Sequence, residues 1–337
     1  MRAHLKMPKD RREVFEQVIR VRVLSLALVA LVLIMFFSFT SGRFLTKTNI
    51  THLLIEVSLV IIVGTGQALV LISKNIDVSV GSIVGLSAFF TADFASRNSS
   101  TPLFLIVIVS IIIGSVLGSI NGLIISTLGV PSIMVTLGTL YVFRGFDSIL
   151  AGSNQVTSQN LPPHFGKIAG WSFLGIPGMF IYAIVICLFA FFFLQHTYSG
   201  RSLVALGSNP LAAKKLGIRS TKWIYIVYVV SGALSGFAGV LWAARYGTVD
   251  SSTATGFELV VLAAVVVGGI NVNGGSGTIG GVFIGAAILA IISVGLSLLN
   301  VSQFWVQAIQ GAVIIAAITS DKIINKRLKL RELKNDN

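Results

Sequence analysis

Polar side chains that could carry chemistry gather in one short segment between two long apolar runs. Residues 75–82 read NIDVSVGS, which places Asn75, Asp77 and Ser79 within a few positions of one another. Irregular backbone at membrane depth persists only where protein buries it or where it lines a cavity. Asn75, Asp77 and Ser79 are therefore candidates for lining a route for a hydroxyl-rich solute. The alternative is a turn in which Asp77 and Ser79 cap the following helix.

A second segment repeats this pattern closer to the carboxyl end. Its sequence NVNGGSGTIGG at 271–281 matches NIDVSVGSIVG at 75–85, so that Asn271 and Asn273 correspond to Asn75 and Asp77. Transporters often contain internal repeats. We expect both segments to be equivalent hairpin turns near an inner gate, on the same side of the membrane. Asn271 and Asn273 are therefore further candidates for the translocation route.

Acidic residues in or beside apolar runs are also candidates, because a charge in lipid is costly. Asp147 follows Arg144 by three positions, a helical spacing that favours a structural ion pair over a proton relay. Glu56 and Glu258 lie near the ends of apolar runs, which favours an interfacial role. The sequence shows no Asp, Glu and His series crossing the runs, as a proton pump would need.

The sequence contains no pattern typical of catalysis, metal binding or nucleotide binding. The four histidines are far apart without metal-ligand spacing, and there is a single cysteine. The sequence GSGTIG at 275–280 resembles a dinucleotide fingerprint, but it opens an apolar run and lies in no βαβ unit. No Ser-His-Asp or paired-carboxylate arrangement appears. We expect a chain that is not an enzyme and that binds no ATP, metal or other cofactor itself.

Composition identifies the solvent around these residues. Of 337 residues 54% are hydrophobic and 11% charged, and the mean hydropathy is +0.90. An average soluble domain carries about 25% charged residues, so these charges cannot cover a water-soluble surface. We interpret the chain as an all-α polytopic membrane protein with about ten transmembrane helices. The apolar runs cover residues 23–39, 53–72, 78–95, 103–126, 132–150, 178–195, 223–243, 258–270, 278–298 and 304–319.

Basic residues fix the orientation of these runs. The net charge of +13 comes mainly from three clusters that flank apolar runs, as the positive-inside rule produces, rather than from a nucleic-acid surface. Ten spans place all three clusters in the cytosol. The sequence thus predicts a basic cytosolic segment at 1–22, one transmembrane domain at 23–320 and a basic cytosolic tail at 321–337. A cytosolic loop at 196–222 interrupts the domain, and the basic ends also suit anionic lipid.

Glycines recur at four-residue spacing inside two of the runs. One series is Gly114, Gly118 and Gly122, and the other is Gly277, Gly281 and Gly285. In lipid such series let helix backbones approach closely. They favour packing within one bundle over a dimer interface.

The cytosolic loop contains its own helix signals in the sequence GRSLVALGSNPLAAKKLGI at 200–218. Ser208 or Asn209 suits the N-cap, and Pro210 suits the first helical position because its missing N–H is not needed there. Gly217 then suits a left-handed C-cap. These residues predict a short amphipathic helix outside the membrane.

Two partners suit this short helix. The paired Ala212 and Ala213 give a slim face able to enter a groove of another protein. Lipid headgroups are the alternative, which Lys214 and Lys215 would also suit.

Four motifs in order resemble the permease subunits of ABC sugar importers of the ribose, rhamnose, xylose, galactose and autoinducer-2 type. Besides the loop motif they are LISKNIDVSVGSIVGL at 71–86, VPSIMVTLGTLYVFRG at 130–145 and VVVGGINVNGGSGTIGG at 265–281. The resemblance covers roughly residues 23–320. Many ribose permeases have GGIDLSVG where this chain has KNIDVSVG at 74–81, which is more similar to autoinducer-2 and rhamnose permeases.

The resemblance implies a type II importer fold and a permease for a monosaccharide or sugar-like solute, such as rhamnose, autoinducer-2, ribose or another pentose or hexose. It also implies a second permease copy or paralogue, a cytosolic ATP-binding cassette subunit that uses ATP-Mg, an extracytoplasmic sugar-binding protein and a location in the bacterial inner membrane. The alternative is an ion-coupled secondary transporter for a small polar solute. By the resemblance, the residues that couple the chain to the ATPase are Gly200, Arg201, Gly207, Asn209, Pro210, Ala212, Ala213 and Gly217.

Overall fold

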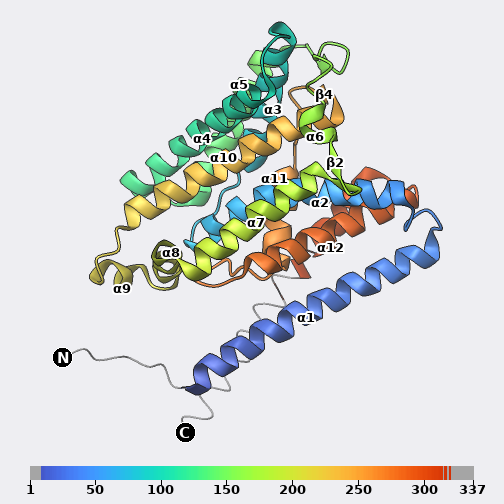
Figure 1. Ribbon diagram of the computed structural model, residues 1–337. Helices are drawn as coiled ribbons and strands as arrows, with labels where there is room; N and C mark the ends of the chain where they lie inside the picture. Colours follow the sequence, from blue (N-terminus) through green and yellow to red (C-terminus); the bar gives the residue numbers. More distant parts are fainter. Residues whose placement is uncertain (1–8, 314, 317–318, 320–337) are drawn as a thin grey trace.

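Helices make up 75% of the computed structural model, which describes residues 9–313, 315–316 and 319, with side chains from residue 24 onward (Figure 1). The long helices are α1 (Lys9–Thr40), α2 (Lys47–Ile72), α3 (Val80–Arg97), α4 (Leu103–Leu128), α5 (Ser132–Ala151), α7 (Gly178–His196), α10 (Ser220–Tyr246) and α12 (Ile279–Leu298). The shorter ones are α6 (Lys167–Gly170), α8 (Tyr198–Ser208), α9 (Pro210–Lys215) and α11 (Phe257–Val267). Residues 303–313 are helical too.

The helices confirm the prediction of an all-α polytopic membrane protein. Six of those described, α2, α4, α5, α7, α10 and α12, are long and apolar enough to cross a membrane. Leu24–Thr40 within α1 and the helix α11 are apolar but shorter. The 11 residues of α11 span roughly 16 Å, about half of a hydrocarbon core. The count of about ten spans stays a prediction.

The core is built around α2, whose residues from Val57 to Ile72 are all buried. It packs against α7, α10, α11 and α12. Beside it, α4 and α10 lie side by side along their length (Figure 1). A Cβ added to Gly114 would lie 2.1 Å from the carbonyl oxygen of Gly232, and one added to Gly118 would lie 2.2 Å from that of Tyr228. Only glycine fits this contact, which confirms close packing within one bundle.

The second glycine series joins α11 to α12. A Cβ at Gly281 would lie 1.9 Å from the carbonyl oxygen of Gly268, and one at Gly285 would lie 2.0 Å from that of Ala264. Gly277 precedes α12 with a φ of 144°, a backbone conformation that favours glycine. The two helices thus form a tight hairpin whose connection is the segment 268–278.

The two ends of the bundle differ in structure. At one end lie α6 and two antiparallel strand pairs, β1 (Val156–Thr157) with β4 (Thr248–Val249) and β2 (Ser172–Phe173) with β3 (Ile176–Pro177). At the other end lie the short helices α8 and α9 (Figure 1). We call this second end the coupling end, because it holds the loop motif predicted to couple.

Candidate coupling site and translocation segment

Local capping rules build the helix α9 as the sequence predicts. Asn209 is the N-cap, and its Oδ1 accepts a hydrogen bond of 3.0 Å from the Ala212 amide. Pro210 is the first helical residue, and Gly217 adopts a left-handed φ of 80°. The helix ends at Lys215, with Leu216 as the C-cap. The predicted helix and its N-cap at Asn209 are confirmed, whereas the C-cap is Leu216 and the left-handed Gly217 follows it.

The residues assigned to coupling divide into buried and exposed groups. Gly200, Gly207 and Ala213 are buried, whereas Arg201 and Ala212 are exposed. The expectation of one slim face formed by both alanines is wrong, because consecutive helix residues point about 100° apart. The buried residues fasten the loop to the bundle, and only the exposed ones are placed to contact a partner.

Gly207 makes the closest contact between the loop and the bundle. A Cβ on it would lie 1.7 Å from the carbonyl oxygen of Ile72 and 2.6 Å from the backbone nitrogen of Gly275. Gly275 N–H also donates a hydrogen bond of 2.9 Å to that Ile72 oxygen, and Ser208 Oγ donates one of 3.2 Å to the Gly275 oxygen. We call this meeting point of α8 with the segments after α2 and α11 the backbone junction.

The sequence did not lead us to predict an exposed apolar surface formed by the leucines at the two ends of α9. Leu211 and Leu216 are each 77% exposed, beside the exposed Lys214 and Lys215. The sequence did contain a signal for this apolar surface: two leucines stand at the ends of a helix that was already expected to lie outside the membrane. They give α9 an apolar surface flanked by positive charge, as a helix that docks on another protein or on a lipid surface would have.

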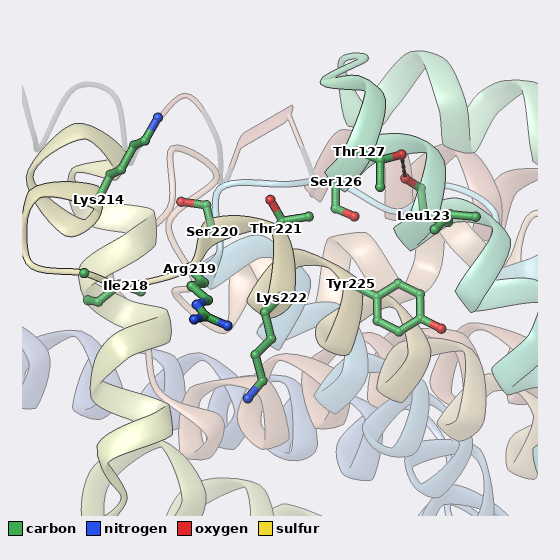
Figure 2. Close-up of a pocket in the computed structure, with 11 residues that line it drawn as sticks. Leu123, Ser126, Thr127, Lys214, Ile218, Arg219, Ser220, Thr221, Lys222 and Tyr225 are labelled. Carbon is green, nitrogen blue, oxygen red and sulfur yellow. Dashed lines mark hydrogen bonds between the residues drawn. The ribbon is translucent and has the colours of Figure 1, made fainter.

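A cavity of about 810 Å³ lies beside α9, between the end of α4 and the start of α10. In Figure 2 Lys214 lies on one side and Ser126, Thr127 and Tyr225 on the other, with Thr221 between them. The Tyr225 hydroxyl is 2.8 Å from Ser119 Oγ, which ties α10 to α4 at this end. Three basic side chains line the cavity, Lys214, Arg219 and Lys222, so the site suits acidic groups of a partner.

The polar segment 73–79 between α2 and α3 begins with a turn at Ser73 and Lys74 and continues through the largely buried residues 75–79 without helix or strand. Ile76 N–H donates a hydrogen bond of 3.1 Å to Ser132 Oγ. Its carbonyl oxygen accepts hydrogen bonds from Tyr228 Oη at 3.0 Å and from Thr136 Oγ1 at 3.3 Å. Side chains of α5 and α10 thus satisfy a backbone without helical bonds, as the membrane interior requires.

The candidate route residues in this segment are buried and make hydrogen bonds within it. Asp77, 1% exposed, accepts hydrogen bonds through Oδ1 from Ser79 N–H at 2.9 Å and Ser79 Oγ at 2.6 Å. Asn75 donates to the oxygen of Ser73 at 3.0 Å. The turn expected as the alternative is therefore present, but the expected side-chain cap is not, because the N-cap residue Ser79 makes no side-chain capping hydrogen bond to α3. Asp77 Oδ2 is buried and has no hydrogen-bond partner among the described residues, so the carboxylate is only partly satisfied.

Sequence reasoning missed Asn121, which donates a hydrogen bond of 2.8 Å to Ser79 Oγ. This asparagine lies in the middle of α4 and is fully buried. A polar residue within a strongly apolar run was the signal that could have revealed it, because such residues face the bundle interior.

The second polar segment meets the first at the backbone junction, as expected for two segments on the same side. Their turns are not equivalent, however. Asn271 Oδ1 accepts a hydrogen bond of 2.9 Å from Asn273 N–H, whereas in the first segment Asp77, the counterpart of Asn273, is the acceptor. Asn273 is exposed and Asp77 is buried. The expected equivalence is wrong, because 271–278 turns within a tight hairpin while 73–79 crosses the interior.

A charged cluster joins α5, α3 and the start of α11. Arg144 Nη1 lies 3.8 Å from Asp147 Oδ2, which confirms the predicted ion pair, and donates a hydrogen bond of 2.6 Å to the Thr253 oxygen. Glu258 Oε2 is buried and lies 1.9 Å from where a Cβ of Gly81 would be, and the interfacial role expected for Glu258 stays a prediction. The cluster ties these elements together inside the protein.

Comparison with known proteins identifies the class to which this architecture belongs. Residues 49–318 match the family model described as branched-chain amino acid transport system / permease component. The chain belongs to this family of transport permeases, which are not enzymes themselves, and it is a multi-pass membrane protein.

Individual relatives are permeases of small-solute importers. The D-allose transport system permease protein AlsC of Escherichia coli K12 is 32% identical over 299 residues, covering 89% of this chain and 91% of that protein. The autoinducer 2 import system permease protein LsrC is 30% identical in Escherichia coli O157:H7 over 92% of this chain and 89% of that protein. In Salmonella typhi it is 31% identical over 88% of this chain and 84% of that protein. No solved structure matches the chain.

Proposed function

We propose that this chain is the transmembrane permease subunit of a binding-protein-dependent ABC importer for a monosaccharide or sugar-like solute. The observation that carries the proposal is the similarity, over about nine tenths of the chain, to permeases of the D-allose and autoinducer 2 systems. The buried polar segment 73–79 supports it, because a hydroxyl-rich solute needs hydrogen-bonding groups inside the membrane.

The chain itself binds no nucleotide in this proposal. A separate ATP-binding cassette subunit uses ATP-Mg and receives α9, with Leu211 and Leu216 as its apolar contacts and Lys214 beside the basic cavity. Because α8 meets two transmembrane segments at the backbone junction, a movement of α9 displaces both together. ATP binding then drives transport by stabilising one channel state over the other.

The importer contains two permease subunits in a type II arrangement: this chain and either a second copy of it or a paralogue. An extracytoplasmic sugar-binding protein delivers the solute. The protein lies in the bacterial inner membrane, with the coupling end and both termini in the cytosol. The distribution of basic residues supports this orientation.

Uptake of radiolabelled D-allose, rhamnose, ribose and autoinducer 2 tests this function in cells that express the complete importer. Cells lacking the ATPase subunit are the control for coupling, and a protonophore is the control for ion gradients. We expect uptake of at least one solute that disappears without the ATPase and survives the protonophore while ATP is maintained. Uptake that persists without the ATPase and stops with the protonophore would instead establish an ion-coupled secondary transporter.

A further inference from the structure

A second cavity, of about 400 Å³, lies far from the coupling end. It is a partly open cavity lined by residues of α2, α10, α11, α12 and the helix at 303–313. Glu56 in its wall stands roughly 24 Å along α2 from Ile72, and Trp242 roughly 33 Å along α10 from Ser220, at 1.5 Å per residue. We call it the distal pocket. Its volume falls in the range of about 300–1,000 Å³ typical of small-molecule sites.

Three amides line one wall of the distal pocket. Gln303, Gln307 and Gln310 recur at spacings of four and three, so they share one face of their helix. Gln310 is only 8% exposed, whereas Gln303 and Gln307 are exposed. Amides in an apolar membrane helix are tolerated where they face protein or a polar cavity. A pocket with only a structural role, or one filled by lipid, would not need three amides on the helix face that lines the pocket.

A carboxylate and an aromatic ring complete the lining. Glu56 Oε1 accepts a hydrogen bond of 2.6 Å from Tyr246 Oη, which fixes the orientation of the carboxylate. The Trp242 ring is held by Phe257, at 5.4 Å between centroids and edge-on, and by Tyr246 at 5.1 Å. The pocket therefore offers a rigid aromatic surface with amides and a carboxylate around it.

This combination matches the surface of a sugar ring. A pyranose or furanose has an apolar C–H face, which packs on an aromatic ring, and hydroxyl groups that donate to carboxylates and pair with amides. We propose that the distal pocket is a binding site for one aldose within a single permease subunit, occupied before the solute reaches the segment 73–79. The inference rests on the proposed function in its choice of a sugar as ligand.

Substrate protection of a single cysteine tests the site in cells expressing the complete importer. Cys187→Ser removes the only native thiol, and Ser293→Cys places a nearly isosteric thiol in the pocket wall on α12. Ser297→Cys, exposed on the same helix outside the pocket, is the matched control. We expect saturating D-allose, or whichever tested aldose the cells import, to slow maleimide labelling at least severalfold in Ser293→Cys and not in Ser297→Cys.

Substitutions of the aromatic surface give a second readout. Adding Trp242→Leu should raise the aldose concentration needed for protection about two- to tenfold, while Trp242→Phe should retain most of the effect. Import of an aldose without protection would overturn the pocket and leave the proposed function standing. Protection without import would retain the pocket and reject the transport function. Equal protection by glycine betaine, or neither protection nor import, would reject the sugar site.

Discussion

Substituting Gly207 tests how the coupling helices are joined to the channel. In Gly207→Ala the added Cβ would lie 1.7 Å from the Ile72 oxygen and 2.6 Å from the Gly275 nitrogen. An ordinary contact needs about 3.4 Å, so α8 must move away by roughly 1.7 Å. Both obstructing atoms are backbone and have no rotamer with which to yield. The strain is about 1–3 kcal/mol, and the two hydrogen bonds of the backbone junction are worth about 1 kcal/mol each.

The expected result is a loss of coupling without a loss of protein. Gly207→Ala should lower the uptake rate about tenfold or more at equal membrane abundance, since 1.4 kcal/mol corresponds to a tenfold change. ATP hydrolysis by the purified importer should lose its stimulation by the sugar-binding protein. Gly280→Ala is the control, because a Cβ there meets no atom of the described residues within 4 Å. Normal uptake by Gly207→Ala would refute the role of the junction.

Two further substitutions probe the interior. Asp77→Ala should reduce uptake severalfold, because the Ser79 N–H and hydroxyl lose their acceptor. Asp77→Asn should retain more activity if the turn rather than the charge matters. Equal uptake by both variants and the parent protein would show that Asp77 has no part in transport. Gly114→Ala should lower the melting temperature of the purified protein, since its Cβ would lie 2.1 Å from the Gly232 oxygen. The control is Gly138→Ala, whose Cβ meets no described atom within 4 Å. Equal melting temperatures of the two variants would contradict the packing argument.

Features set by neighbouring residues could be predicted from the sequence. Asn209 and Pro210 start α9, and Gly217 follows its C-cap Leu216 in a left-handed conformation, because capping depends on hydrogen bonds within a few residues. The packing role of Gly114 was likewise accessible, since four-residue spacing places glycines on one helix face. Helix positions follow from apolar runs for the same reason.

Features set by tertiary contacts could not be predicted. The burial of Gly207 depends on where α8 lies against Ile72, far away in sequence, and the burial of Ala213 depends on how α9 packs against α8 and α10. The repeat of 75–85 at 271–281 correctly predicted that the two segments lie on the same side, but it wrongly predicted equivalent turns. Similar sequences fold differently here because one copy lies between α2 and α3 and the other within a tight hairpin. The distal pocket arises only when five helices meet.

The backbone junction has a consequence for how such importers diversify. Its contacts are made largely by main-chain atoms of Ile72, Gly207 and Gly275, so they impose small size on a few positions and nothing on the exposed surface of α9. Leu211 and Leu216 can therefore change to match a different ATPase while the mechanical linkage to the channel stays intact. The same transmembrane domain can thus work with a different ATPase subunit after changes to a few residues on α9.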